Sequence, residues 1–184
     1  MIRLENIKAI YMKHIDQLYA YALHLGFGEA VAMDAIHDVF YNICTNKTCL
    51  KDILNIKFYL FRALKNRLVD IHRTHKEHID IASTNQDICE NIPFNFSITI
   101  EDELIEKEEQ NEIKQKVENV LARLTNRQRE IIYLRYIQEY DYDEISELMN
   151  ISVESCRNLI SKAMSKLREN PLLFSQLITL IIAN

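Results

Sequence analysis

Glycine and proline are almost absent from this chain, which contains only two of each among its 184 residues. Tight β-hairpins and the turns of doubly wound α/β folds depend on these residues, because glycine adopts positive φ angles and proline fixes turn geometry. Hydrophobic residues make up 48% of the chain, enough for a substantial core. The composition therefore predicts an all-α fold, and it disfavours a nucleotide site built on a glycine-rich loop.

A short helix, a turn and a longer basic helix are predicted in the last third of the chain. Asp141 and Glu144 have the spacing of a capping box at the start of a helix over 142–149. Asn150 tolerates the left-handed conformation that ends a helix, and Ser152 is a good N-cap for the next one. This layout is typical of a DNA-reading helix-turn-helix.

The longer helix has two different faces. Apolar residues spaced by three or four predict one buried stripe, formed by Val153, Cys156, Ile160, Ala163 and Leu167. The other face carries serine, arginine, asparagine and lysine, which bind base edges and phosphates in a major groove. A solvated face on an ordinary core helix is the alternative, and the helix-turn-helix spacing favours DNA. The candidate DNA-binding residues are Ser155, Arg157, Asn158, Ser161, Lys162 and Lys166.

Motifs in residues 119–169 resemble domain four of the extracytoplasmic-function (ECF) sigma factors of bacterial RNA polymerase. Thr125 and Gln128 form a second capping box ahead of an apolar helix. The motifs that carry the resemblance are Arg127-Gln128-Arg129-Glu130, Tyr142-Asp143-Glu144-Ile145-Ser146-Glu147 and Ile151-Ser152-Val153. The resemblance implies that the second helix of the helix-turn-helix reads the −35 element of a promoter.

Three amphipathic helices are predicted in the first half of the chain. They span about 8–25, about 29–44, and Asp52 or Asn55 to about Thr74. Gly26 and Gly28 break the pattern after the first helix, and a polar loop at 45–48 follows the second.

This half resembles domain two of the same family. The resemblance rests on Ala32-Met33-Asp34-Ala35-Ile36-His37-Asp38-Val39-Phe40 and on Tyr59-Leu60 followed by Asn66, Asp70 and Arg73. In the family, the first of these helices docks on a basic coiled coil of the largest polymerase subunit. Asp34, Asp38 and Phe40 are therefore the candidate polymerase-binding residues, and the two carboxylates, four residues apart, share one helix face. Ordinary solvated acids are the alternative.

The same resemblance implies a site for the −10 element, whose non-template strand is opened. The candidate residues are Thr45, Asn46, Lys47 and Thr48 in the loop and Asn66, Arg67 and Arg73 on the third helix. The family often has Trp or another aromatic residue at the end of the second helix. This chain has no Trp and places Cys44 there, so strand opening would depend on Phe40, Tyr41 and the loop.

The net charge of −5 conceals an uneven distribution. Basic residues dominate 55–76 and 123–136, whereas acidic residues dominate 101–112. Two DNA-facing domains joined by an acidic segment would have this pattern. The expected map is domain two at 1–76, a linker at 77–101, domain four at 102–170 and an apolar tail at 171–184.

Neither metal nor cofactor chemistry is expected. The four cysteines, Cys44, Cys49, Cys89 and Cys156, include no C-x-x-C pair and indicate reduced cytosolic thiols. His72, His75 and His78 are interpreted as a surface histidine run, because no carboxylate or cysteine completes a metal site. No signal peptide is apparent, and the apolar tail is too short to span a bilayer, so core packing or docking to a partner is its ordinary explanation.

The leading hypothesis is a cytoplasmic, non-enzymatic sigma factor whose partners are core RNA polymerase, promoter DNA and an anti-sigma factor. A helix-turn-helix regulator that acts without polymerase is the first alternative, although the N-terminal half shows no ligand-binding or phosphoacceptor domain. A remote alternative is a helical ribonuclease of the HEPN type, because Arg67 and His72, preceded by Asn66, match its short signature.

Overall fold

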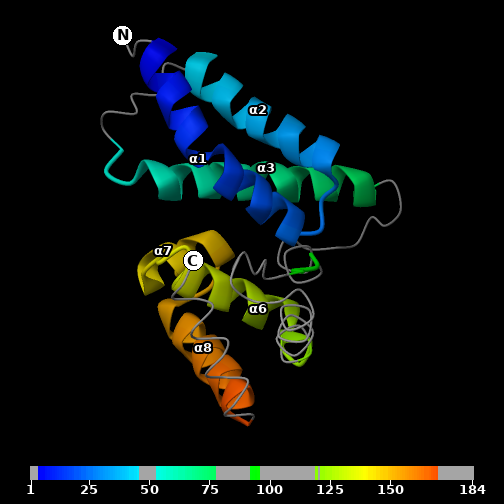
Figure 1. The fold of residues 1–184 in the computed structure, drawn as a ribbon. Helices are drawn as coiled ribbons and strands as arrows, with labels where there is room; N and C mark the ends of the chain where they lie inside the picture. Colours follow the sequence, from blue (N-terminus) through cyan, green and yellow to red (C-terminus); the bar gives the residue numbers. More distant parts are fainter. Residues whose placement is uncertain (1–3, 46–52, 78–91, 96–118, 120, 170–184) are drawn as a thin grey trace, which may run out of the picture. The chain divides into compact units, whose positions relative to one another are not determined.

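The computed structural model describes residues 4–45, 53–77, 92–95, 119 and 121–169 (Figure 1). Every regular element in these ranges is helical, which confirms the all-α prediction. The elements are α1 (Leu4–His24), α2 (Glu29–Thr45), α3 (Ile56–Glu77), α6 (Asn126–Ile132), the π-helix η2 (Tyr133–Ile137), α7 (Tyr142–Met149) and α8 (Val153–Arg168). The predicted acidic segment, the apolar tail and most of the predicted linker lie outside the described residues.

The chain divides into two compact units, Met1–Pro93 and Phe94–Asn184. We call them the N-terminal and C-terminal units. The boundary falls inside the segment 77–101, which the sequence predicts to be a linker. Ile92 and Phe94, on either side of it, are buried, so this part of the segment contributes to packing.

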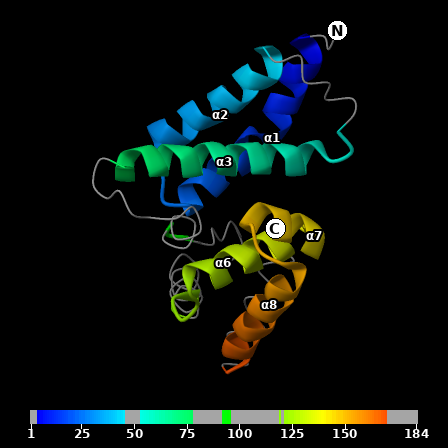
Figure 2. The same ribbon diagram turned by 180° about the vertical axis from the view of Figure 1, so that it is seen from behind.

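In the N-terminal unit, α1 and α2 run antiparallel side by side, and α3 crosses both of them (Figures 1 and 2). The Tyr21 and Phe61 rings, 5.1 Å apart between centroids, join α1 to α3 in the core. The largest fully buried side chains of this unit are Leu18, Tyr21, Ile36, Leu60, Phe61, Leu64 and Leu68. The apolar residues at the edge of this core are half-buried, namely Ile15, Val31, Ile56, Tyr59, Ala63 and Ile71.

The turn between α1 and α2 requires glycine at one position. Gly26 has φ +78°, a conformation that ends α1 and that L-residues with a Cβ rarely adopt. A Cβ at Gly26 would lie 2.7 Å from Cγ of Pro93, which packs against this turn. Gly28, in contrast, has open space around its α-carbon and accepts a hydrogen bond from the Ala32 amide at 2.9 Å.

Helix α3 begins at the second of its two candidate start sites. The Asn55 side chain accepts a hydrogen bond from the Phe58 amide at 3.0 Å, as an N-cap does. Leu60, Leu64 and Leu68, spaced by four residues, form the buried face of this amphipathic helix.

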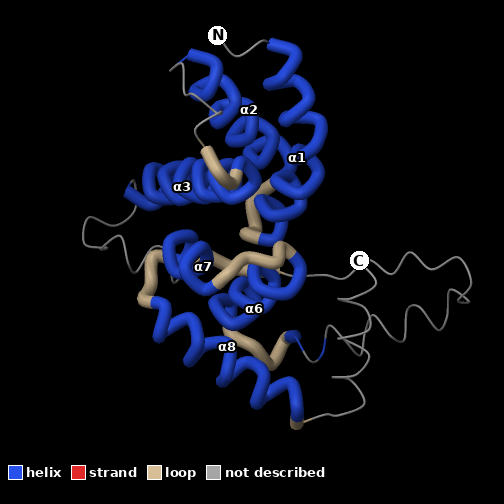
Figure 3. Tube along the Cα trace, turned by 90° about the vertical axis from the view of Figure 1, so that its left-hand side faces the viewer, coloured by secondary structure: helices blue, strands red, loops and turns tan. Residues whose placement is uncertain are grey.

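In the C-terminal unit, α8 packs against both α6 and α7 (Figure 3). Arg127 supports this arrangement by donating to the carbonyl of Met149 at 3.4 Å, which ties α6 to the end of α7. Tyr133 packs against Phe94 in the core. Burial raises the pKa of Tyr133 to about 12, although the amide of Gln138, which donates to its hydroxyl at 2.8 Å, acts in the opposite direction.

The π-helix η2 was not predicted from sequence. Its wider turn brings the Gln138 amide to the carbonyl of Tyr133 at 3.1 Å, and Glu139 then adopts φ 62°. The Tyr140 amide bonds to the carbonyl of Leu134 at 3.1 Å, so the chain reverses directly into α7. Apolar periodicity does not distinguish one wide turn from an ordinary α-helical turn.

Replacing Gly26 with Ala should destabilise the N-terminal unit by more than about 1 kcal/mol, because Ala in the left-handed region costs roughly 1–2 kcal/mol and its Cβ would also displace Pro93. Urea denaturation of the full chain, followed by circular dichroism, measures the effect. Gly28→Ala is the matched control and should change the free energy of unfolding by only a few tenths of a kcal/mol. Equal effects of the two substitutions would contradict this explanation.

Candidate nucleic-acid interface

The turn between α7 and α8 is built by three local features that the sequence predicts. A carboxylate oxygen of Asp141 accepts from the Glu144 amide at 2.8 Å, and Glu144 returns the bond to the Asp141 amide at 3.0 Å. Asn150 ends α7 in the left-handed conformation, with φ 52° and ψ 51°. The hydroxyl of Ser152 then accepts from the Ser155 amide at 3.1 Å and begins α8. The predicted helix-turn-helix geometry is confirmed.

The apolar stripe of α8 is also confirmed. Cys156, Ile160, Ala163 and Leu167 are buried, and Val153 is half-buried at the start of the helix. Burial raises the pKa of the Cys156 thiol, so this cysteine stays protonated and acts as a small apolar residue. With this stripe facing inward, the opposite side of α8 faces outward.

The outward face of α8 carries most of the candidate DNA-binding residues. Arg157, Asn158, Ser161 and Lys162 are exposed. Ser155 is exposed too, but its hydroxyl lies 2.9 Å from that of Ser152 and belongs to the helix cap.

Lys166 differs from the other candidates on α8. Its ammonium group donates to the side-chain oxygen of Gln128 at 3.3 Å and to the carbonyl of Arg123 at 3.4 Å. It therefore fastens the last turns of α8 to the start of α6. This internal role was missed, because it joins residues far apart in the sequence.

A second feature that was missed is a cluster of two arginines on one tyrosine ring. The guanidinium carbon of Arg157 lies 5.5 Å from the centroid of the Tyr142 ring, and that of Arg135 lies 5.0 Å from the same centroid. Arg135 also donates to the carbonyl of Tyr140 at 2.8 Å. The wide turn of η2 brings Arg135 to this place, and no sequence period reveals it.

The two candidate carboxylates of α2 differ from one another. Asp34 is exposed. Asp38 accepts from Arg67 of α3, with Nη2 at 2.7 Å and Nε at 2.9 Å from one of its oxygens. Nearly half of each side chain is exposed, 47% for Asp38 and 45% for Arg67. The sequence pattern suggests different partners for Asp38 and Arg67, whereas the structure brings the two residues together.

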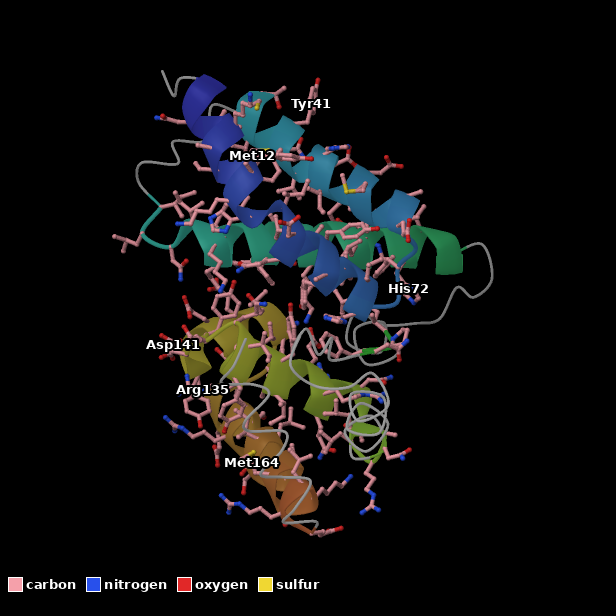
Figure 4. The ribbon with its side chains drawn as sticks, in the orientation of Figure 1. Met12, Tyr41, His72, Arg135, Asp141 and Met164 are labelled. Atoms are coloured by element: carbon pink, nitrogen blue, oxygen red, sulfur yellow. The ribbon has the colours of Figure 1, made fainter. Side chains whose placement is uncertain are left out.

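Phe40 does not lie on the surface, so its assignment to polymerase binding is corrected. Only 6% of it is exposed, and its ring packs edge-on against Tyr11 of α1 at 5.0 Å. An aromatic residue on the inward stripe of α2 fills the core. The neighbouring Tyr41 is 68% exposed and projects from α2 (Figure 4).

The described candidates for the −10 element lie at the C-terminal end of α2 and on α3. Thr45 is the last residue of α2, and its hydroxyl donates to the carbonyl of Tyr41 at 3.0 Å. Asn46, Lys47 and Thr48 lie outside the described residues. On α3, Asn66 is exposed, and Nη2 of Arg73 lies 3.6 Å from Oδ1 of Asp70. Lys65 of the same basic segment is buried.

The residues that suggested a ribonuclease or a metal site have separate surroundings. Arg67 binds Asp38, whereas His72 packs edge-on against Phe27 with 6.4 Å between ring centroids. These separate partners disfavour a shared nuclease site. The side chains of His75 and His78 lie outside the described part, within which no three metal-binding side chains gather. None of the described helices could cross a membrane.

Comparison with known proteins places this geometry in context. Residues 114–167, which include α6, η2, α7 and all but the last residue of α8, match the family model Sigma-70, region 4. The ECF RNA polymerase sigma factor SigM of Bacillus subtilis is 24% identical over 172 residues, which cover 89% of this chain and 93% of SigM. The chain is a homologue of the ECF sigma factors.

Two further comparisons agree with this relationship. RNA polymerase sigma factor SigZ of Bacillus subtilis is 23% identical to this sigma-factor homologue over 89% of the chain and 86% of SigZ. The sigma factor RpoE, solved in complex with the anti-sigma factor NepR from Bartonella quintana, has the same fold. Its TM-score is 0.60, with 17% identity, and the alignment covers 90% of this chain and 96% of RpoE.

The left-handed residue in the turn of this homologue gives a stability test. Asn150→Ala should destabilise the C-terminal unit by about 1 kcal/mol, because Ala tolerates the left-handed region less well than Asn does. Asn150→Gly should leave the free energy of unfolding within a few tenths of a kcal/mol of its original value, since Gly adopts this region freely. Urea denaturation compares the two variants, and a larger loss with Gly than with Ala would refute the argument.

Proposed function

We propose that this protein is a dissociable specificity subunit that binds core RNA polymerase and directs transcription initiation at particular promoters. The complete helix-turn-helix within the segment that matches Sigma-70, region 4 carries this proposal. The two Bacillus subtilis relatives, both RNA polymerase sigma factors by name, align over 89% of the chain, so the N-terminal unit is included. A helix-turn-helix regulator that acts without polymerase would be expected to resemble sigma factors in the C-terminal unit alone.

In this proposal, α8 reads the −35 element from the major groove. Arg157 can make a bidentate contact with guanine, Asn158 can do so with adenine, and Ser161 and Lys162 extend the same face. All four residues are exposed opposite the buried stripe. Promoter preference would thus depend on a few side chains of one helix.

Helix α2 is proposed to dock on a basic surface of the polymerase through Asp34 and Asp38. Carboxylates at such an interface favour fast and selective association. Asp34 is exposed, whereas Asp38 is held by Arg67. The two residues would therefore contribute differently, with Asp34 available directly.

The end of α2 and the outer face of α3 are proposed to act on the −10 element during opening. Tyr41 offers an exposed ring on which an unpaired base can stack, which Phe40 does not. On α3, Asn66 is exposed and Arg73 is half-exposed. Arg67, whose Nε and Nη2 bind Asp38, would contact a phosphate through its remaining N–H donors. The loop residues Asn46, Lys47 and Thr48 complete this proposal.

The remaining parts of the proposal follow from this role. A promoter-specificity subunit acts by binding, not by catalysis, and works in the cytoplasm with the polymerase. An anti-sigma factor is the proposed regulator, and RpoE, which has the same fold, was solved in complex with one.

Reconstitution with core RNA polymerase tests the function as a whole. The full chain should co-purify with core enzyme and allow it to initiate from a subset of a randomised promoter library. Failure to bind core enzyme, together with sequence-specific binding of duplex DNA by the chain alone, would favour the polymerase-independent regulator instead.

Two lysines of α8, four residues apart, should respond differently to substitution. Lys162→Ala should weaken binding of −35 duplexes and lower the slope of log affinity against log salt by about 1, because one phosphate contact is lost. Lys166→Ala should chiefly lower the stability of the C-terminal unit, since its ammonium group is bound to Gln128. Titrations of the holoenzyme at several salt concentrations, with urea denaturation beside them, separate the two effects. An equal change of slope would show that Lys166 also contacts phosphate.

The two carboxylates of α2 give a test of docking. Asp34→Lys should weaken the affinity for core polymerase by several-fold without changing the free energy of unfolding, because Asp34 is exposed. Asp38→Lys should weaken docking as well, and it should also destabilise the N-terminal unit, since a second cation would face Arg67. Asp16→Lys, the same charge change on an exposed position of α1, is the control. Unchanged core affinity for Asp34→Lys would remove Asp34 from the interface.

A further inference from the structure

We propose that Tyr142 is a positioning residue for promoter selection, because its ring holds the guanidinium group of Arg157 in place for reading a base. This inference rests on the proposed function, in which α8 reads the −35 element. It adds to that function a residue outside α8, on the first turn of α7.

The contact between Tyr142 and Arg157 joins the two helices of the helix-turn-helix. The guanidinium carbon of Arg157 lies 5.5 Å from the ring centroid, inside the range of about 6 Å in which a cation is attracted to an aromatic face. Tyr142 directly follows the capping residue Asp141, so its backbone is fixed at the start of α7. The ring thereby gives the exposed side chain of Arg157 a defined position.

Arg135, seven residues before Tyr142, places a second guanidinium group on the same ring. It lies on η2, its guanidinium carbon is 5.0 Å from the same ring centroid, and it donates to the carbonyl of Tyr140 at 2.8 Å. The ring therefore contacts both a cation fixed to the scaffold and a cation on the reading helix. The contacts run from η2 through Arg135 and Tyr142 to Arg157.

The contact with the ring leaves Arg157 able to bind a base. Among the described residues, Arg157 donates no hydrogen bond to the protein, whereas Arg135 uses a donor on a carbonyl. An arginine has five N–H donors, and two of them suffice for the O6 and N7 atoms of guanine. Fixing the side chain before DNA binds reduces the conformational entropy that is lost on binding.

The test measures base preference with the full chain bound to core polymerase, on promoters that vary one position of the −35 element at a time. Arg157→Ala should relax preference at one position. Tyr142→Leu should relax preference at that same position by about two- to fivefold, the range expected for an exposed cation–π contact. Tyr142→Phe, which keeps the ring, should retain the original preference.

Two further variants complete the design. Tyr136→Leu removes an exposed ring from η2, which makes it a matched control that should leave base preference unchanged. Tyr142→Leu in the Arg157→Ala background should cause no additional relaxation, because the ring acts through Arg157. Circular dichroism verifies that each variant folds. If Tyr142→Leu unfolds, Arg135→Gln replaces it in the test. Arg135→Gln is expected to relax preference at the same position, but less strongly.

The outcomes distinguish this inference from the function on which it rests. If Arg157→Ala relaxes one position and Tyr142→Leu changes none, or weakens every promoter equally, the positioning role is overturned while the reading role of α8 stands. An equal effect of Tyr142→Leu with and without Arg157 would also overturn it. If Arg157→Ala leaves base preference untouched, the assignment of the reading helix fails and the positioning role fails with it.

Discussion

The apolar stripe of α8 is buried against α6 and α7 and consists of Cys156, Ile160, Ala163 and Leu167. Moving the register of α8 by one residue would rotate the helix by about 100° and expose this stripe to water. The outward direction of Arg157, Asn158 and Lys162 is therefore a consequence of core packing. A DNA-reading surface on a single helix depends on this constraint, because the buried stripe fixes the rotation of α8.

The features that could be predicted from the sequence are those that depend on residues within one turn of each other. The caps at Asp141 and Ser152, the left-handed Asn150 and the apolar stripes were all predicted in the places where the structure has them. Each follows from local hydrogen bonding or from a period of 3.6 residues. The order of the helices, and with it the fold class, follows from the same local signals.

The features that were missed join side chains on different elements. Lys166 reaches Gln128, Arg67 reaches Asp38, and Arg157 meets the ring of Tyr142. The periodicity of the sequence predicts none of these pairs, since each depends on how two helices cross. The residue types alone suggested that lysines and arginines contact phosphate, yet Lys166 and Arg67 have protein acceptors.

The side-chain oxygen of Gln128 accepts two hydrogen bonds, from the Thr125 amide at 3.1 Å and from the ammonium group of Lys166 at 3.3 Å. One buried atom thus belongs both to the N-cap of α6 and to the last turns of α8. The end of a helix ordinarily frays with little cost in free energy. Here, fraying of α8 would also remove the ammonium group of Lys166 from the side-chain oxygen of Gln128, which caps α6. The two helix ends are therefore expected to open as one cooperative unit, and amide hydrogens at both ends would exchange with similar protection.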